Sequence, residues 1–214
     1  NPVTVTVDLN PISDAYTDTP LVSSGSKDNL VKFTLKTGPY TSISDSTYAG
    51  EFDATVSGGT SFAAYCYDLT KDLKGSGSFN LTIEQLDNVA RLFAVAGFDG
   101  QDWANDGVTG FQTAALQVAI WESKYDGLSL SNYSLTNGNL KFSDIGSSVS
   151  AQAITYLKAA KNLSVGSYNP NVFLYTPTTS NQALVTTVPE PSTYALMAAC
   201  LGVVGLVARR KKSV

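Results

Sequence analysis

The sequence contains no histidine among its 214 residues. This absence excludes catalytic sites that use an imidazole base, such as Ser-His-Asp and Cys-His arrangements, and it excludes histidine-ligated metal sites. Charged residues are also scarce, at 15% of the chain, whereas apolar residues make up 43%. A chain with so little charge, whose polar positions are mostly Ser, Thr, Gly and Asn, is more typical of an exported β-rich protein than of a cytosolic one.

Basic residues are few, and four of them are concentrated at positions 209–212 near the C-terminus. Residues 1–208 hold the other 10 of the 14 basic residues together with all 18 acidic residues. An acidic body of this kind offers no basic surface for a phosphate backbone, so we expect no nucleic-acid partner.

The C-terminal segment combines three unlike elements in a short space. The triplet Pro189, Glu190 and Pro191 is followed by the apolar run 194–208 and then by Arg209, Arg210, Lys211 and Lys212. The run is shorter than the roughly 20 residues of a full membrane span, but we expect it to form a single transmembrane helix. The basic cluster is expected on the cytoplasmic side, which leaves the rest of the chain beyond the inner membrane.

This order of elements resembles the PEP-CTERM sorting signal of Gram-negative bacteria. The resemblance implies that the C-terminal helix anchors the chain in the inner membrane until an exosortase-type protease cuts near the Pro-Glu-Pro triplet. The processed protein is then expected at the cell surface or in the extracellular matrix of a biofilm. The chain opens directly into an alternating run at Val3–Leu9, so we expect that an export signal has already been removed.

Residue patterns predict strands in the first seventy positions and helices in the middle of the chain. Alternation predicts strands at Val3–Leu9 and 30–35, and a hairpin of 48–56 and 61–69 is expected around the turn at 57–60. A polar loop is expected at 71–78. Capping-box patterns at Thr82–Gln85 and Thr109–Gln112 predict helices that end near Ala96 and Tyr125, and a third helix is expected over 150–161. Two closing strands are expected at 172–175 and 183–186.

These elements predict an α+β fold with a β-rich, sandwich-like or barrel-like body, an inserted helical pair and the C-terminal transmembrane helix. We assign residues 1–176 to the exported domain, 177–188 to a linker and 189–212 to the sorting signal.

Cys66 and Gln117 each stand out from their surroundings. Cys66 is the only cysteine outside the tail, because the second one, Cys200, lies in the apolar run. Gln117 is a single carboxamide inside the apolar helix 114–121. A buried amide without a partner costs roughly 1–3 kcal/mol, so Gln117 needs either a hydrogen bond to a neighbouring strand or loop, or a meeting with Cys66.

The strings Tyr65-Cys66-Tyr67 and Gln117-Val118-Ala119-Ile120-Trp121 together resemble the thioester domains of bacterial surface proteins. In that family a strand cysteine and a helix glutamine form an internal thioester. The resemblance implies Cys66 as the sulfur donor and Gln117 as the acyl donor, and we expect Tyr65, Tyr67 and Trp121 to shield the bond from water.

The expected function is adhesion by covalent capture of an amine or hydroxyl nucleophile, such as a protein lysine or a polysaccharide hydroxyl. Because capture happens once per molecule, we expect no enzymatic turnover, no catalytic residue, no cofactor and no metal. A buried thiol has a raised pKa, so some group must help to form the bond. Asp68 and Glu122 lie beside the reacting residues, but we expect both to be solvent-facing charges or caps.

Three other interpretations remain open. The first is a non-covalent structural or binding β-protein of the extracellular matrix, in which Cys66 is inert. The second is an unusual hydrolase, against which the lack of histidine and of a nucleophile elbow argues. The third is a calcium site at 99–107, but this segment lacks the alternating oxygen ligands of an EF-hand, and we expect a surface loop there.

Overall fold

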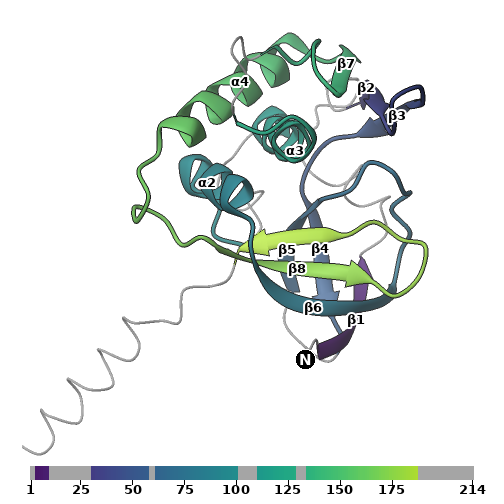
Figure 1. The fold of residues 1–214 in the computed structure, drawn as a ribbon. Helices are drawn as coiled ribbons and strands as arrows, with labels where there is room; N and C mark the ends of the chain where they lie inside the picture. The colour runs from purple at the N-terminus through teal and green to yellow at the C-terminus, as the bar shows by residue number, and fades with distance from the viewer. Residues whose placement is uncertain (1–2, 10–29, 58–60, 101–109, 129–133, 188–214) are drawn as a thin grey trace, which may run out of the picture.

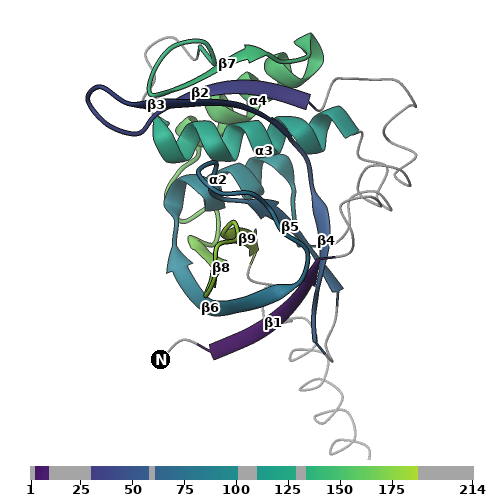
Figure 2. The same cartoon turned by 90° about the vertical axis from the view of Figure 1, so that its right-hand side faces the viewer.

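A computed structural model describes residues 3–9, 30–57, 61–100, 110–128 and 134–187. Six of its strands form a closed barrel in the order β1-β4-β5-β9-β8-β6 (Figures 1 and 2). They are β1 (Val3–Leu9), β4 (Phe52–Val56), β5 (Ser61–Cys66), β6 (Gly77–Gln85), β8 (Asn171–Pro177) and β9 (Leu184–Thr187). Every neighbouring pair is antiparallel, and the β1–β6 pair closes the ring.

The other elements form a second layer that lies against one side of the barrel (Figures 1 and 2). They are the three-stranded sheet β3-β2-β7, made of Ser42–Tyr48, Leu30–Lys36 and Leu140–Asp144, and the helices α2 (Asp87–Ala96), α3 (Gly110–Tyr125) and α4 (Ser147–Asn162). Figure 2 shows α3 between the barrel and the three-stranded sheet, with α2 and α4 beside it.

The position of α3 explains its composition. All residues from Thr113 to Ser123 are buried, so the helix has no solvent-facing side along most of its length. A helix that is apolar all round must be enclosed by other elements. Here α2 and α4 pack against it, and β7 touches it from the sheet. The polar side chains of this helix are therefore placed in the interior of the molecule.

Several sequence predictions are confirmed. The strands β1 and β2 occur where alternation predicted them, β8 and β9 occur where two closing strands were expected, and β4 and β5 pair as the expected hairpin. The helix expected over 150–161 is α4, which begins three residues earlier. The second predicted capping box lies partly outside the described residues, but the helix that it was to open is α3 and ends at Tyr125 as expected.

The first predicted capping box is wrong. Thr82–Gln85 belongs to β6, where Thr82 pairs with Leu174 and Ile83 pairs with Phe173 of β8. Helix α2 begins only at Asp87, and its N-cap Leu86 makes no side-chain capping bond. Strand β6 is stabilised by hydrogen bonds to two neighbouring strands, and these bonds are stronger than the local helix preference of a four-residue pattern. Because they join segments far apart in the chain, they leave no local signature in the sequence. The same strand replaces part of the loop expected at 71–78.

Two further strands were not predicted. β3 and β7 flank β2, and β3 is polar along nearly its whole length, with the sequence Ser42-Ile43-Ser44-Asp45-Ser46. Polar edge strands give no hydrophobic alternation, which is the signal that sequence patterns use.

The barrel extends beyond the predicted domain boundary. Strand β9 lies within the span 177–188 that we assigned to a linker, and it pairs with both β5 and β8. The expected transmembrane segment 194–208 lies outside the described residues. Among the helices of the described part of the chain, none combines the length and apolar character needed to cross a membrane.

Candidate functional site

Cys66 is the last residue of β5. At this residue, β5 still pairs with β9 on one edge but no longer pairs with β4 on the other edge. On one edge, Cys66 is paired with Leu184 of β9, and the next amide, that of Tyr67, donates to the Ala183 carbonyl at 2.7 Å. On the other edge, β4 pairs with β5 only as far as Ala64. Successive residues of a strand direct their amides to alternate edges, so the main-chain groups of Cys66 face the edge that β4 has left.

The side chain of Gln117 fills this gap. Its Oε1 accepts a hydrogen bond from the Cys66 amide at 2.8 Å, and its Nε2 donates to the Cys66 carbonyl at 2.7 Å. The carboxamide thus pairs with β5 as a residue of a neighbouring strand would. Both residues are buried, with 1% of Gln117 and 8% of Cys66 exposed. The structure brings together the two residues that the sequence singled out.

This arrangement has direct chemical consequences. The carboxamide carbon is held against the main chain of the residue that bears the thiol, and the thiol can turn about a single side-chain torsion. The Cys66 amide donates to the oxygen that would become negative if sulfur attacked that carbon. Burial raises the pKa of the Cys66 thiol well above its usual range, so the thiol is protonated at rest.

The segment that follows Cys66 runs alongside α3 and contacts the C-terminal end of this helix. The Leu69 amide donates to the Tyr125 hydroxyl, which donates to Asp68 Oδ1, each at 3.1 Å. Lys124 Nζ lies 4.0 Å from the centre of the Tyr67 ring and 4.0 Å from Asp68 Oδ2. From Gln117 to Tyr125 the helix rises about 12 Å, and the extended segment from Cys66 to Leu69 covers a similar length of about 10 Å. The strand end and the helix therefore run side by side and hold each other in register.

The three expected shielding residues are in different surroundings. Tyr65 is fully buried, and its ring packs on Phe93 and Phe98, with centroids at 6.1 and 5.1 Å. Tyr67 is half-buried under Lys124. Trp121 is 1% exposed and lies one helical turn after Gln117, on the same face of α3. Because side chains alternate along an extended chain, Tyr65 of β5 and Tyr67, the residue after this strand, point to the face opposite to the Cys66 side chain. Trp121 is thus the best placed of the three to cover the pair.

Asp68 is partly buried in a network of hydrogen bonds. Its Oδ1 accepts from the amide and the hydroxyl of Thr70, both at 2.7 Å, and from Tyr125. Burial alone would raise the pKa of Asp68, but these bonds and the nearby Lys124 outweigh it and lower the pKa. Asp68 therefore stays ionised and ties the strand end to α3.

The expectation for Glu122 is wrong. We expected a solvent-facing charge, but Glu122 is 0% exposed, and neither carboxyl oxygen has a hydrogen-bond partner among the described residues. Burial, and to a smaller degree the charge of Asp126, raise the pKa of Glu122 from 4.5 to about 8. Glu122 directly follows an apolar segment of α3 that has no polar face. The composition of this helix therefore already indicated that Glu122 is buried.

Metal ligation has no support in the described ranges. They contain no group of three or more acidic or cysteine side chains that could hold an ion. Most of the loop at 99–107 lies outside the residues that the structure describes.

Comparison with known families identifies the C-terminal segment. Residues 187–212 match the PEP-CTERM protein-sorting motif. The match includes Pro189, Glu190, Pro191 and the basic residues 209–212, and it confirms the resemblance predicted for the tail. The motif implies processing by an exosortase, export and a route to the cell surface.

No curated protein matches the sequence. The N-terminal thioester domain of fibronectin-binding protein SfbI from Streptococcus pyogenes is similar at 16% identity and a TM-score of 0.43, over 78% of this chain and 97% of that domain. The N-terminal domain of the pilus tip adhesin Cpa from the same organism is similar at 15% identity and a TM-score of 0.41, with the same coverage.

Proposed function

We propose that this chain is an exported surface protein that forms an internal thioester between Cys66 and Gln117 and uses it to capture a nucleophile covalently. The observation that supports the proposal best is the pair of hydrogen bonds, at 2.8 and 2.7 Å, between the Gln117 carboxamide and the main chain of Cys66. The sorting motif would deliver such a domain to the outside of the cell, where partners with free amines and hydroxyls occur.

Bond formation starts with attack of the Cys66 sulfur on the side-chain carbonyl carbon of Gln117. The electron pair of the C=O bond moves to Oε1, where the Cys66 amide stabilises the developing charge. When the carbonyl re-forms, the C–Nε2 bond breaks. The thiol proton goes to Nε2, which leaves as ammonia, and the product is an S–C(=O) bond between the two side chains.

Capture reverses the roles of the atoms. An amine nitrogen or hydroxyl oxygen of the partner attacks the thioester carbon, the Cys66 sulfur leaves and takes up the proton of the nucleophile, and an amide or ester joins Gln117 to the partner. Each domain reacts once, so the chain acts as a single-use adhesin without turnover. Trp121, which lies one turn from Gln117, would limit hydrolysis by excluding water.

A second candidate function is non-covalent, and one observation favours it. The Gln117 amide already satisfies both main-chain groups of Cys66 where β4 ends, which is a sufficient structural reason for a buried glutamine. In that case Cys66 is a small buried apolar residue, and the chain is a structural or binding β-protein of the matrix.

The intact mass of the purified protein separates the two candidates. Thioester formation expels ammonia, so the wild type should be about 17 Da lighter than its sequence predicts, whereas Cys66→Ala should have its full mass. Gln117→Glu is the matched control, because its carboxyl keeps the shape of the side chain but has no ammonia to lose. A wild type of full mass would support the non-covalent alternative.

Methylamine tests the capture step. It should add to the wild type and restore a free thiol at Cys66, and it should leave Cys66→Ala and Gln117→Glu unmodified. Addition to all three proteins would locate the reactive group elsewhere in the chain.

A further inference from the structure

The three-stranded sheet has one polar face that no described element covers. Its opposite face is apolar and buried, with Val31, Phe33 and Leu35 of β2 and Leu140 and Phe142 of β7. Because side chains alternate along a strand, the residues between them point outward. The outward residues are Lys32, Thr34, Lys36, Ser42, Ser44, Ser46, Lys141 and Asp144. We call this set the outer sheet face.

The three lysines of the outer sheet face differ in whether an acidic side chain pairs with them. Lys32 forms an ion pair of 3.0 Å with Asp144 at one end of the sheet. At the other end, Lys36 and Lys141 have no acidic partner among the described residues. Lys141 lies opposite Thr34, two residues before Lys36, so the two lysines are diagonal neighbours at about 7–8 Å between main chains. Two lysines placed in this way on neighbouring strands can approach one anion from two sides.

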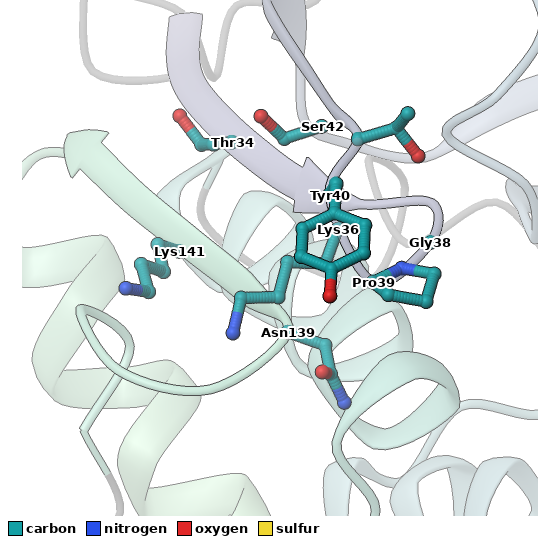
Figure 3. A pocket seen from close by; sticks show the side chains of 9 residues that line it. Thr34, Lys36, Gly38, Pro39, Tyr40, Ser42, Asn139 and Lys141 are labelled. Carbon is teal, nitrogen blue, oxygen red and sulfur yellow. The ribbon is translucent and has the colours of Figure 1, made fainter.

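A pocket of about 300 Å³ lies at this end of the sheet. Figure 3 shows Lys36 and Lys141 extending from their strands on the side where Asn139 also lies, with Tyr40 beside them. Hydroxyl groups of Thr34 and Ser42 complete the lining. The volume is at the lower end of the range for small-ligand sites, which is sufficient for a single ring.

One wall of the pocket is the loop between β2 and β3, and it is internally braced. The Thr37 amide donates to the Thr41 carbonyl at 3.0 Å, and the two hydroxyls bond at 3.1 Å. A side chain at Gly38 would come within 2.7 Å of the Thr41 hydroxyl, so only glycine fits without a shift. This braced loop presents Tyr40 with 100% of its side chain exposed. A tyrosine held entirely in solvent adds nothing to the core, and both faces of its ring are open to contact with a ligand.

The opposite wall is fixed by the end of α3. Asp126 accepts from the Asn139 and Leu140 amides at 2.7 and 2.8 Å. Gly138 has a φ of +108°, and a side chain there would meet the Asp126 carboxyl at 2.6 Å. The Asp126 charge is thus engaged with main-chain amides. Both walls are preorganised, which lowers the entropy cost of binding.

We propose that this pocket binds an acidic polysaccharide through one uronic-acid unit. The sugar carboxylate lies between the ammonium groups of Lys36 and Lys141, and the apolar face of the sugar ring packs on Tyr40. Ser42 and the Oδ1 of Asn139 bond to the sugar hydroxyls, because Asn139 Nδ2 already donates to the Tyr125 carbonyl and the Thr34 hydroxyl already bonds to Ser44. A sugar fits the combination of an aromatic surface with many hydroxyl and amide groups better than an acidic peptide does, because a peptide carboxylate needs no ring contact. The pocket is on the other sheet from Cys66, so this binding is independent of thioester chemistry.

The test is calorimetric titration of the full chain with oligogalacturonate and, as the matched probe, with the same oligomer after methyl esterification. The acid form should bind, and the esterified form should bind at least tenfold more weakly, because it lacks the charge. Lys36→Ala and Lys141→Ala should each weaken binding about tenfold, since each removes a hydrogen bond to a charged group. Tyr40→Ala should also weaken it.

Matched controls make the result specific to the pocket. Lys32→Ala, on the same face but paired with Asp144, should change affinity less than twofold, and Cys66→Ala should bind like the wild type. Several results would overturn the proposal: no binding of the acid form, equal binding of both forms, equal loss with Lys32→Ala, or retained binding by Lys36→Ala/Lys141→Ala, which would indicate the basic tail. Equal affinity for polyglutamate would also overturn it in favour of an acidic peptide.

Discussion

Two turns of α3 each bury a polar side chain, but only one of these side chains has hydrogen-bond partners among the described residues. Around Gln117, the carboxamide has both of its polar atoms bonded to the main chain of Cys66. Around Glu122, five residues later, the carboxyl group is equally buried and has no hydrogen-bond partner among the described residues. The same helix thus carries one amide whose oxygen and nitrogen are both bonded and one acid without a hydrogen-bond partner in that part of the chain.

The difference follows from what each turn faces. The turn at Gln117 meets the barrel where β4 has ended and a strand edge needs a partner. The carboxyl of Glu122 has no hydrogen-bond partner among the described residues, so it avoids the cost of a buried charge by keeping its proton, as its raised pKa reflects. The buried amide of Gln117 therefore completes the barrel edge, whereas the buried carboxyl of Glu122 becomes neutral.

The largest expected effect is at Gln117. The effect is measured in the Cys66→Ala background, which cannot form the thioester and keeps the carboxamide of Gln117. There, Gln117→Ala should lower the free energy of unfolding by about 5 kcal/mol, because it opens a cavity and leaves the amide and carbonyl of residue 66 without partners. Gln117→Met refills the volume without hydrogen bonds and should recover about half of the loss. Denaturant titration measures both, and a Gln117→Met protein as stable as its Cys66→Ala parent would mean that these hydrogen bonds contribute nothing.

The second effect is a pH dependence at Glu122. Since the folded state raises the pKa of Glu122 from 4.5 to about 8, the associated stability is fully present below pH 4.5 and is lost as pH rises through 8. The total loss is about 5 kcal/mol for a buried group. Glu122→Gln should remove this slope, so its unfolding curves should separate from those of the wild type between pH 4.5 and 8. Parallel pH profiles of the two proteins would contradict the raised pKa.

A smaller effect is expected at Tyr125, which links α3 to the strand end. Tyr125→Phe removes the bonds to the Leu69 amide and to Asp68, and it should cost about 2 kcal/mol in thermal or chemical unfolding. Tyr40→Phe is the control, because that side chain is fully exposed and its hydroxyl should not affect stability. If both variants match the wild type, the register between strand end and helix does not depend on this hydroxyl.

The smallest effect is expected at Lys124. Its ion pair with Asp68 is 4.0 Å long and its contact with the Tyr67 ring is at 4.0 Å, so Lys124→Ala should cost about 1 kcal/mol or less. Part of that loss should disappear at 1 M salt, where charge pairs are screened. A loss above 2 kcal/mol that salt does not change would indicate a packing role for the lysine stem instead.

Sequence patterns predicted the elements whose signals are local. Alternation in β1 and β2, the hairpin of β4 and β5, and the apolar run of α3 all occur as expected. Patterns failed for β6, where a capping-box motif suggested a helix start, for β3, which is polar along nearly its whole length, and for β7, which alternates over only five residues. The partners of β6 and β7 lie far away in the chain and leave no local trace.

The candidate site divides in the same way. Cys66 and Gln117 were identifiable because a lone thiol and a lone amide contrast with apolar neighbours. The pocket at Lys36 and Lys141 had no such contrast, since lysines, threonines and serines on an exposed sheet look like ordinary surface. Glu122 was identifiable in principle from the composition of α3, but its position at the end of the apolar run suggested solvent.

The sequence by itself determined that the chain ends in a sorting motif, that α3 is buried, and that one cysteine and one glutamine lie in apolar surroundings. All three depend on residue types close together in the chain. Only the tertiary structure decided that β4 ends before Cys66 and that α3 crosses at that point, so that a side-chain amide completes the barrel edge. The reason is that an unpaired strand edge depends on where a neighbouring strand stops, and that is set by packing between distant segments.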